Sequence, residues 1–451
     1  MEQAKPSRLF AIVVLAAVST LLVVWSLTHA YVGDESFHLL AAKLIAVGKK
    51  PYVDFFYQHP PVFVYIMAAM LRISGVSWRS VHLFSALCII GSILFAIAFG
   101  RLIYRDTKER WWNATFVTAL IGVNAYVLMF ATNGLPFGFC LLCVTASLYW
   151  SQSDTSGGLF LCGLLAATAG AASLLVAPII PVLLIWIWLR ERPRLLWVML
   201  GVFAGFLPLF AFLLAAPHQT IRDVIGFHLI DRPGFDWRQN LTEVARWLLP
   251  TQGLILAVVA VASLRARKES AIRLCALIAL VLGVVLLVIK ATASFYFVVL
   301  TPLLSILAAS WLTDAIARDR QRGVLLSGAI MALYLIGLLA IERFRGIDAP
   351  YREVHQLARS IEACAPSGNF YASEATYFEA STLPPAYMEN RYVPSSVPDS
   401  ALSAGAFDAV LIAADNPKVV QYRLAEKYAR RTVTNYSSYK LLLFCGRVMH
   451  R

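Results

Sequence analysis

The stretch "LFAIVVLAAVSTLLVVWSLTHAYVGDESFHLL", residues 9–40, joins an apolar run to two adjacent carboxylates. The apolar part, 9–28, has the length of a transmembrane helix, which needs roughly 20 apolar residues. No signal-peptide cleavage site follows it, so we expect it to be kept as the first span. Asp34 and Glu35 then stand where the chain leaves the lipid. A charge at that position is either kept in water or kept for a function.

The composition of the whole chain indicates a polytopic membrane protein. Of its 451 residues, 59% are hydrophobic and only 14% are charged, and the mean hydropathy is +0.69. A soluble protein of this length needs more charge to cover its surface. The net charge of +13 arises mainly in short loops between apolar runs. This distribution is typical of topology determinants and argues against a nucleic-acid partner.

Apolar runs of about 15 to 22 residues predict about eleven membrane spans. They are expected at 9–28, 80–100, 113–131, 134–150, 158–176, 177–189, 195–216, 251–264, 272–289, 295–312 and 324–341. A run at 60–71 is too short to cross and is expected to form an interfacial or re-entrant helix.

The positive-inside rule predicts the orientation of these spans. Lys5 and Arg8 precede the first span, so the N-terminus is expected in the cytoplasm. The later basic loops, on the same side, are 101–110, 190–194, 264–273 and 317–323. The segments expected on the other side are the first external loop 29–79, the loop 217–250 and the tail from residue 342.

The tail, 342–451, changes composition and predicts a small external α/β domain after a membrane domain formed by residues 1–341. The run "FDAVLIAA" (407–414) is typical of a buried strand, and a helix is expected to begin at Asn416. Cys364 and Cys445 could form a disulfide in an exported domain. Unpaired buried thiols are the interpretation that the sequence favours.

The two carboxylates have a structural interpretation as well as a functional one. An amphipathic helix is predicted from Ser36 to Val47, and a carboxylate suits its first turn. Taken alone, this interpretation is favoured. The segment continues, however, with "GKKPYVDFFYQHPPVFVYIMA" (48–68), which adds Asp54, His59, two prolines and an aromatic helix with Tyr65.

This order of features resembles the membrane glycosyltransferases of the GT-C fold, which include protein O-mannosyltransferases and the lipid A aminoarabinose transferase. In that superfamily an Asp-Glu pair opens the first external loop, and an aromatic segment with prolines follows. An arginine commonly comes near the next helix. The corresponding stretch here, "WRSVHLFSAL" (78–87), has His82 at that position and Arg79 one turn earlier.

Two later segments extend the resemblance. The stretch "FATNGLPF" (130–137) has Asn133 where the family usually has an aspartate. The stretch "KATASFYFVVLTP" (290–302) is similar to a family motif with a basic residue, a tyrosine and a proline, here Lys290, Tyr296 and Pro302.

The resemblance implies a transferase that moves a sugar from a polyprenyl-phosphate donor to a hydroxyl of an extracytoplasmic lipid, glycan or protein, with inversion at the anomeric carbon. Asp34 is the expected general base, and Glu35 is expected to orient it or to bind a cation or the acceptor. The candidates to bind the leaving phosphate are Arg79, His82 and Lys290. The candidates to bind substrate are Asp54, His59, Tyr65, Asn133 and Tyr296.

A divalent cation is a further expectation that the sequence leaves open. Magnesium, manganese or calcium could be held by Asp34 with Asp54 and His59, or by Asp34 with Asn133. A zinc-like cluster of His29, His38 and His59 is less favoured. We expect His38 to hydrogen-bond a carboxylate instead.

Two rival functions are a transporter or lipid-linked glycan flippase, and a catalytically silent membrane scaffold. The spans contain few charges and the chain has no repeated halves, which argues against a transporter. The departures at His82 and Asn133 keep the scaffold open. The expected location is the bacterial inner membrane.

Overall fold

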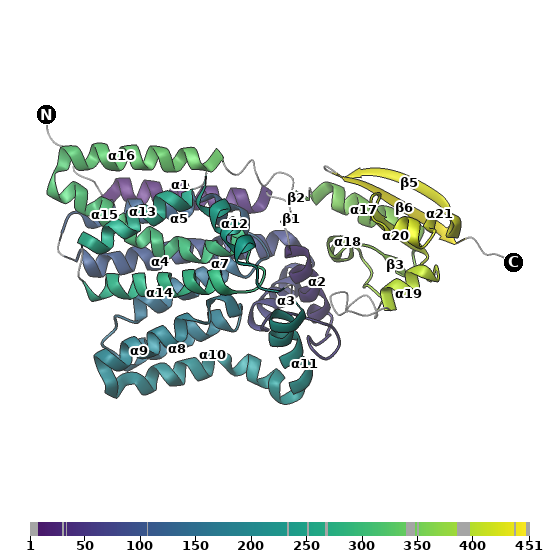
Figure 1. The fold of residues 1–451 in the computed structure, drawn as a ribbon, viewed down its shortest axis with the longest axis horizontal. Coiled ribbons are helices and arrows are strands. Elements are labelled where there is room, and N and C mark those ends of the chain that lie inside the picture. The colour runs from purple at the N-terminus through teal and green to yellow at the C-terminus, as the bar shows by residue number, and fades with distance from the viewer. Residues whose placement is uncertain are drawn as a thin grey trace.

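The computed structural model describes residues 8–28, 31–32, 34–105, 107–231, 234–249, 252–266, 269–339, 348–349, 351–385, 397–436 and 439–447. Figure 1 shows a bundle of long helices and, beside one end of it, a small α/β unit formed by the C-terminal part of the chain. This arrangement confirms the predicted fold class, a polytopic helical protein with a C-terminal α/β domain.

Each of the predicted spans overlaps a helix of the bundle, and the run at 113–131 is divided between α5 and α6 (Ala125–Phe130). The long helices are α1 (Arg8–Thr28), α4 (Trp78–Ile103), α5 (Arg110–Gly122), α7 (Phe137–Trp150), α8 (Ser156–Gly170), α9 (Ile179–Glu191), α10 (Leu195–Ala215), α13 (Gln252–Ala266), α14 (Ser270–Val288), α15 (Thr301–Arg318) and α16 (Arg320–Ile336). In the described residues, six helical stretches are long and apolar enough to cross a membrane. A bent pair, α12 (Trp237–Leu248) with α13, adds a seventh.

Small residues allow the bundle helices to approach closely. Along α10, Gly201 and Gly205 form a GxxxG pattern that faces α8. A Cβ on Gly201 would lie 2.1 Å from the carbonyl oxygen of Phe160, which no real side chain tolerates. Helices in lipid associate through such close backbone contact, because lipid tails are as apolar as the helices themselves.

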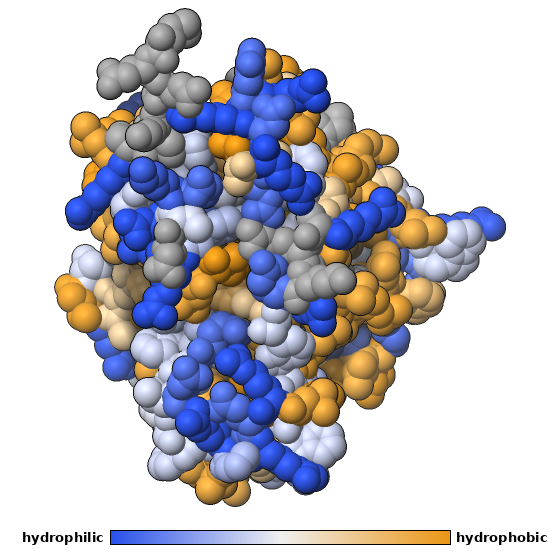
Figure 2. Space-filling view, turned by 90° about the vertical axis from the view of Figure 1, so that its left-hand side faces the viewer, coloured by the Kyte–Doolittle hydropathy of each residue, from blue (hydrophilic) through white to orange (hydrophobic). Residues whose placement is uncertain are grey.

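The end of the bundle opposite the C-terminal unit is hydrophilic. Figure 2 looks onto this end and shows hydrophilic side chains across it, with hydrophobic ones at its margin. The ends of α4, α5 and α9, and the segments that join α4 to α5 and α9 to α10, carry exposed basic side chains that the sequence assigned to one side of the membrane. Among them are Arg101, Arg105, Lys108, Arg110, Arg190 and Arg192.

Short helices cover the other end of the bundle (Figure 1). They include α2 (Glu35–Ala46), α3 (Val62–Ser74), α6 (Ala125–Phe130), α11 (Pro217–Ile221), a π-helical turn (Arg222–Asp231), α12, and 3-10 turns at Leu174–Val176 and Ser294–Leu300.

Helix α2 is buried nearly all round, with ten of its twelve residues covered. Helix α3 lies against one side and α18 (Glu374–Glu379) against another. The sequence predicted an amphipathic helix from Ser36 to Val47 that is suited to lying at the membrane interface. The structure instead gives Glu35, His38 and Lys43 buried partners in other elements.

The C-terminal unit contains a four-stranded sheet in the order β3–β4–β6–β5. Strands β3 (Phe370–Tyr371) and β4 (Ala409–Ala413) are parallel, whereas β6 (Tyr439–Arg447) is antiparallel to both β4 and β5 (Tyr428–Tyr436). Its helices are α17 (Tyr351–Cys364), α18, α19 (Val397–Ser403), α20 (Lys418–Gln421) and α21 (Leu424–Lys427). The helix predicted from Asn416 is divided, because Arg423 adopts a left-handed backbone with φ of 49°.

A disulfide joins Cys364, the last residue of α17, to Cys445 in β6. The preference for unpaired thiols was therefore wrong. The two residues are 81 positions apart in sequence, and only the packing of α17 on the sheet brings their Cα atoms to 5.4 Å. The other five cysteines are buried and free.

Candidate active site

A cavity of about 370 Å³ opens at the end of the bundle where α2 and the π-helical turn lie. Helices α2 and α14 supply opposite parts of its wall, together with residues before α3 and after α6. Much of the wall is apolar. The apolar lining side chains are Leu135, Pro136, Phe137, Leu174, Leu175, Leu229, Val285, Val288, Ile289 and Phe295.

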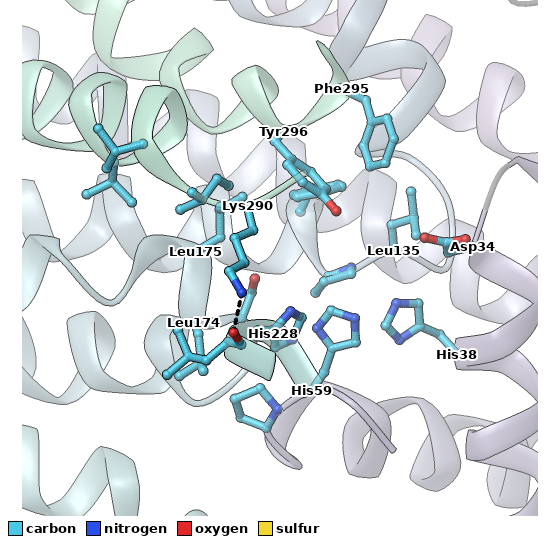
Figure 3. A pocket seen from close by; sticks show the side chains of 18 residues that line it. Asp34, His38, His59, Leu135, Leu174, Leu175, His228, Lys290, Phe295 and Tyr296 are labelled. Carbon is cyan, nitrogen blue, oxygen red and sulfur yellow. Dashed lines mark hydrogen bonds between the residues drawn. The ribbon is translucent and has the colours of Figure 1, made fainter. Parts of the chain in front are cut away.

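A row of polar side chains extends along the cavity from one wall to the opposite one. Figure 3 shows Asp34 at one edge, Lys290 toward the opposite wall, and three imidazoles between them. The ring centroids of His38 and His59 are 4.8 Å apart, and those of His59 and His228 are 5.8 Å apart. The cavity therefore offers a carboxylate, a cation and a row of imidazoles to one ligand.

Asp34 reaches the cavity because it is the residue before helix α2 begins, where the chain turns at the end of the bundle. Its side chain is exposed. One turn further along the helix, His38 is buried, and its Nδ1 lies 2.9 Å from the hydroxyl of Tyr57. The predicted carboxylate partner of His38 is thus a tyrosine. Burial lowers the pKa of His38 to about 3, so its ring is neutral at physiological pH.

On the opposite wall, backbone carbonyls hold two side chains in place by hydrogen bonds. His228 lies in the π-helical turn, and its Nε2 donates to the carbonyl of Gln58 at 2.9 Å. The Lys290 ammonium, just past the end of α14, donates to the carbonyl of Leu229. A carbonyl only accepts, so Nε2 of His228 carries a hydrogen. The turn thereby connects α14 to the segment before α3.

Glu35 and His82 form a buried pair behind the cavity. Nε2 of His82 contacts Oε1 of Glu35, and both side chains are at most 1% exposed. The same carboxylate oxygen accepts from the backbone N–H of Gly134 at 2.8 Å. Nδ1 of His82 lies 2.8 Å from the carbonyl oxygen of Ser26. These contacts join α2 to α1, α4 and the turn before α7, and neither side chain lines the cavity.

The structure brings four of the ten predicted site residues into the cavity wall: Asp34, His59, Lys290 and Tyr296. Besides Glu35 and His82, four others lie elsewhere, as the following contacts show.

Arg79 is exposed and covers the ring of Trp78 at 4.9 Å. Asp54 is exposed and accepts from the backbone N–H of Lys50 at 2.6 Å. Tyr65 packs on Phe212.

Asn133 is buried, and its amide is used locally. It donates to the carbonyl of Met129 at 2.9 Å and accepts from the N–H of Leu135 at 3.1 Å. The Asn133 amide thereby shapes the turn that gives Glu35 its Gly134 contact.

The predicted metal ligands do not come together. Within the described residues, no group of three or more His, Cys, Asp or Glu side chains is close enough to hold a metal ion. Of the predicted ligands, Asp34 and His59 line the cavity, whereas Asp54 and Asn133 do not. The zinc-like alternative included His29, which lies outside the described residues.

Sequence reasoning missed His228 as a site residue. It lies in the loop 217–250, far along the chain from the carboxylate pair. The only available signal was a histidine in an apolar stretch, "IGFHLI" (225–230), and that pattern has no specific chemical meaning. The π-helical turn, which folds over the end of the bundle, places it at the cavity.

No protein-family model matches the sequence, and no curated protein sequence is significantly similar to it. Solved structures are similar in fold. ArnT from Cupriavidus metallidurans, bound to undecaprenyl phosphate, has a TM-score of 0.68 at 15% identity, and the match covers 97% of this chain and 98% of ArnT. The oligosaccharyltransferase of Archaeoglobus fulgidus, in complex with zinc and sulfate, has a TM-score of 0.54 at 13% identity over 83% of this chain and 57% of its own.

The match to ArnT extends over both the helical bundle and the C-terminal unit, since it leaves only 3% of this chain uncovered (100% minus 97%). The second match covers less of both chains and has a lower score. The protein is therefore a multi-span membrane protein with the GT-C fold.

Proposed function

We propose that the protein is an integral-membrane glycosyltransferase that moves a sugar from a polyprenyl-phosphate donor to a hydroxyl group of an acceptor. The observation that carries this proposal is the single cavity that holds Asp34, Lys290 and an apolar wall. An anionic lipid-linked sugar needs such a combination, because its phosphate, sugar and isoprenoid must be bound together. The fold shared with ArnT, which was solved with undecaprenyl phosphate, supports the same donor class.

Asp34 is the proposed general base. Its carboxylate takes the proton of the acceptor hydroxyl, and the acceptor oxygen attacks the anomeric carbon. The bond from that carbon to the phosphate oxygen breaks, and its electron pair leaves with the phosphate. A single displacement of this kind inverts the anomeric configuration. Asp34 then returns its proton to water.

Lys290 is the proposed partner of the leaving phosphate. The donor is a phosphate diester and the product a monoester, so negative charge develops on the phosphate oxygens in the transition state. A fixed cation is worth more there than in the ground state. His59 and His228 lie between Asp34 and Lys290 and are the proposed hydrogen-bonding partners of the sugar or the phosphate.

The proposed location of the chemistry is the extracytoplasmic face of a bacterial inner membrane. The basic loops lie at the end of the bundle opposite the C-terminal unit (Figures 1 and 2). Basic loops stay in the cytoplasm, so the cavity and the C-terminal domain, residues 342–451, would face outward. The disulfide between Cys364 and Cys445 supports an oxidising compartment for that domain.

The experiment is a sugar-transfer assay on the purified protein in detergent. Radiolabelled polyprenyl-phosphate hexoses and pentoses are the donors, and release of label is followed for the wild type, Asp34→Asn and Asp154→Asn. Loss of a general base should lower the rate by about 10² to 10⁴-fold in Asp34→Asn. Asp154, exposed before α8 at the far end of the bundle, is the matched control and should keep wild-type turnover.

Equal turnover of the wild type and Asp34→Asn would reject the proposed base. The same assay with EDTA, followed by magnesium, manganese or calcium, tests the predicted divalent cation. A rate lost in EDTA and restored by one of these ions would assign that ion to the cavity.

A further inference from the structure

Lys43 is a buried cation in helix α2, at only 4% exposure. Its Nζ lies 2.6 Å from the carbonyl oxygen of Ala380 and 2.8 Å from that of Tyr377. The carbonyls of Phe378 and Thr382 are each 3.3 Å away. A buried ammonium without partners costs several kcal/mol. The four carbonyl oxygens replace its water, so this contact forms only while the C-terminal unit lies on α2.

These carbonyls belong to the end of α18 and the loop that follows it. The last carbonyls of a helix have no partner within the helix and carry its negative dipole end, so a cation stabilises them. Lys43 therefore caps α18 from the membrane bundle. Glu362 holds the same loop from the other side, since its carboxylate accepts from the N–H of Ser381 at 2.6 Å and of Thr382 at 3.3 Å.

A second contact holds the chain just before α2. Strand β1 (Tyr31–Val32) pairs antiparallel with β2 (Asp348–Ala349), in the segment that leads into the C-terminal unit. Asp34 follows β1 by two residues, and Lys43 lies near the other end of α2. Asp34 and His38 lie between these two contacts. The C-terminal part of the chain thus holds the segment that carries them at both of its ends.

We infer that Lys43 is a positioning residue through which the C-terminal unit fixes α2, so that Asp34 and His38 keep their places at the cavity. The catalytic consequence rests on the proposed function, whereas the anchoring of α2 does not. The C-terminal unit is then a working part of the active site, and not a separate module that only binds a partner.

The position of Lys43 predicts which kinetic constant depends on it. Lys290 and the apolar wall belong mainly to the bundle, and they would bind the donor whether or not α2 is fixed. The position of the Asp34 carboxylate at the cavity, in contrast, depends on α2. Loosening α2 should therefore lower kcat by about 10²-fold, the effect of a misplacement of about 1 Å, and leave KM for the donor unchanged.

The test compares the full-length wild type with Lys43→Met, Glu362→Ala and Lys50→Met. Methionine keeps the length and apolar stem of lysine and removes its charge. Glu362→Ala weakens the same contact from the C-terminal unit, in case Lys43→Met fails to fold. Lys50→Met is the matched control, because Lys50 follows α2 closely and is exposed.

Three measurements are made on each protein. Hydrogen–deuterium exchange reports on peptides 35–46 and 374–382. Carbethoxylation of His38 by diethyl pyrocarbonate, read by mass spectrometry, reports on the cavity and needs no activity. Sugar transfer gives kcat and KM. In Lys43→Met and Glu362→Ala we expect exchange in both peptides to be faster by about tenfold, His38 to react, and only kcat to fall. Lys50→Met should match the wild type.

The outcomes separate this inference from the proposed function. Unchanged exchange in both peptides overturns the anchor. Faster exchange with unreactive His38, or with unchanged kcat in an active protein, overturns the positioning role. If the wild type transfers no sugar from any donor while exchange and His38 reactivity change as expected, the proposed function fails and the positioning of α2 stands.

Discussion

Replacing Glu35 tests whether the two adjacent carboxylates have different roles. Its carboxylate contacts Nε2 of His82 and accepts from the N–H of Gly134. Nδ1 of His82 must carry a hydrogen, because the carbonyl of Ser26 that it faces can only accept. One further proton lies between Nε2 and the carboxylate, as an imidazolium–carboxylate pair or as a neutral imidazole with a carboxylic acid.

The two possible replacements should differ in cost. In Glu35→Ala, the N–H of Gly134 and Nε2 of His82 both lose their partner in a fully buried site, which should lower the free energy of unfolding by about 3 to 5 kcal/mol. In Glu35→Gln, an amide oxygen in the place of Oε1 still accepts from the N–H of Gly134. Only the contact of that atom with Nε2 of His82 is lost, at a cost of about 1 kcal/mol.

The assay is denaturant unfolding in mixed micelles, together with sugar transfer on the same preparations. We expect Glu35→Gln to be slightly destabilised and close to wild type in rate, and Glu35→Ala to be strongly destabilised. Asp34→Asn, one residue away, should show the reverse pattern of intact stability and lost turnover. A Glu35→Gln protein that is as stable as the wild type and as inactive as Asp34→Asn would refute this division of roles.

Three further predictions follow from contacts described above. Burial lowers the pKa of His38 from 6.5 to about 3, so between these two pH values only the unfolded chain binds the proton. The free energy of unfolding should therefore fall by about 1.4 kcal/mol per pH unit as the pH drops below 6.5. His38→Gln should remove this slope in acid unfolding. Lys290→Met should lower kcat by about 10² to 10³-fold in single-turnover assays. Arg79 does not line the cavity, so kcat of Arg79→Met should stay within about threefold of the wild type. Equal losses of kcat in the two variants would contradict the assignment of the phosphate site. Reducing the bond between Cys364 and Cys445, or replacing both by serine, should destabilise the C-terminal unit by about 2 to 5 kcal/mol. Limited proteolysis within that unit should then be faster, and unchanged cleavage would mean that the bond adds nothing.

Local patterns in the sequence predicted the fold. The length and apolarity of each run predicted a helix, because a chain in lipid must satisfy its backbone hydrogen bonds within each segment. The run at 407–414 was predicted as a buried strand, and it forms β4. Asp34, His59 and Lys290, which the resemblance suggested as site residues, line one cavity.

The errors occurred where a side chain depends on distant partners. Glu35 was expected to orient Asp34 or to bind a cation or the acceptor, and His82 to bind the leaving phosphate. The two residues are 47 positions apart, and packing places them against one another. Asn133 stands where the family has an aspartate, and Arg79 lies one turn before the position of the expected arginine. Asn133 hydrogen-bonds within its own turn, and Arg79 covers an indole ring. Local sequence cannot predict such contacts, since they depend on how helices cross.

The sequence by itself determined that this chain spans a membrane many times, which end of the bundle is basic, and which short segment carries the acidic pair. These properties follow from hydropathy and charge along the chain, which need no knowledge of neighbours. Tertiary structure alone decided that Asp34 faces the cavity while Glu35 is buried, that His228 joins the row of imidazoles, and that Lys43 lies among carbonyls of a domain more than 330 residues away. Each of these depends on contacts between segments far apart in sequence. A buried polar group has lost its water and must hydrogen-bond with whichever group the fold places next to it.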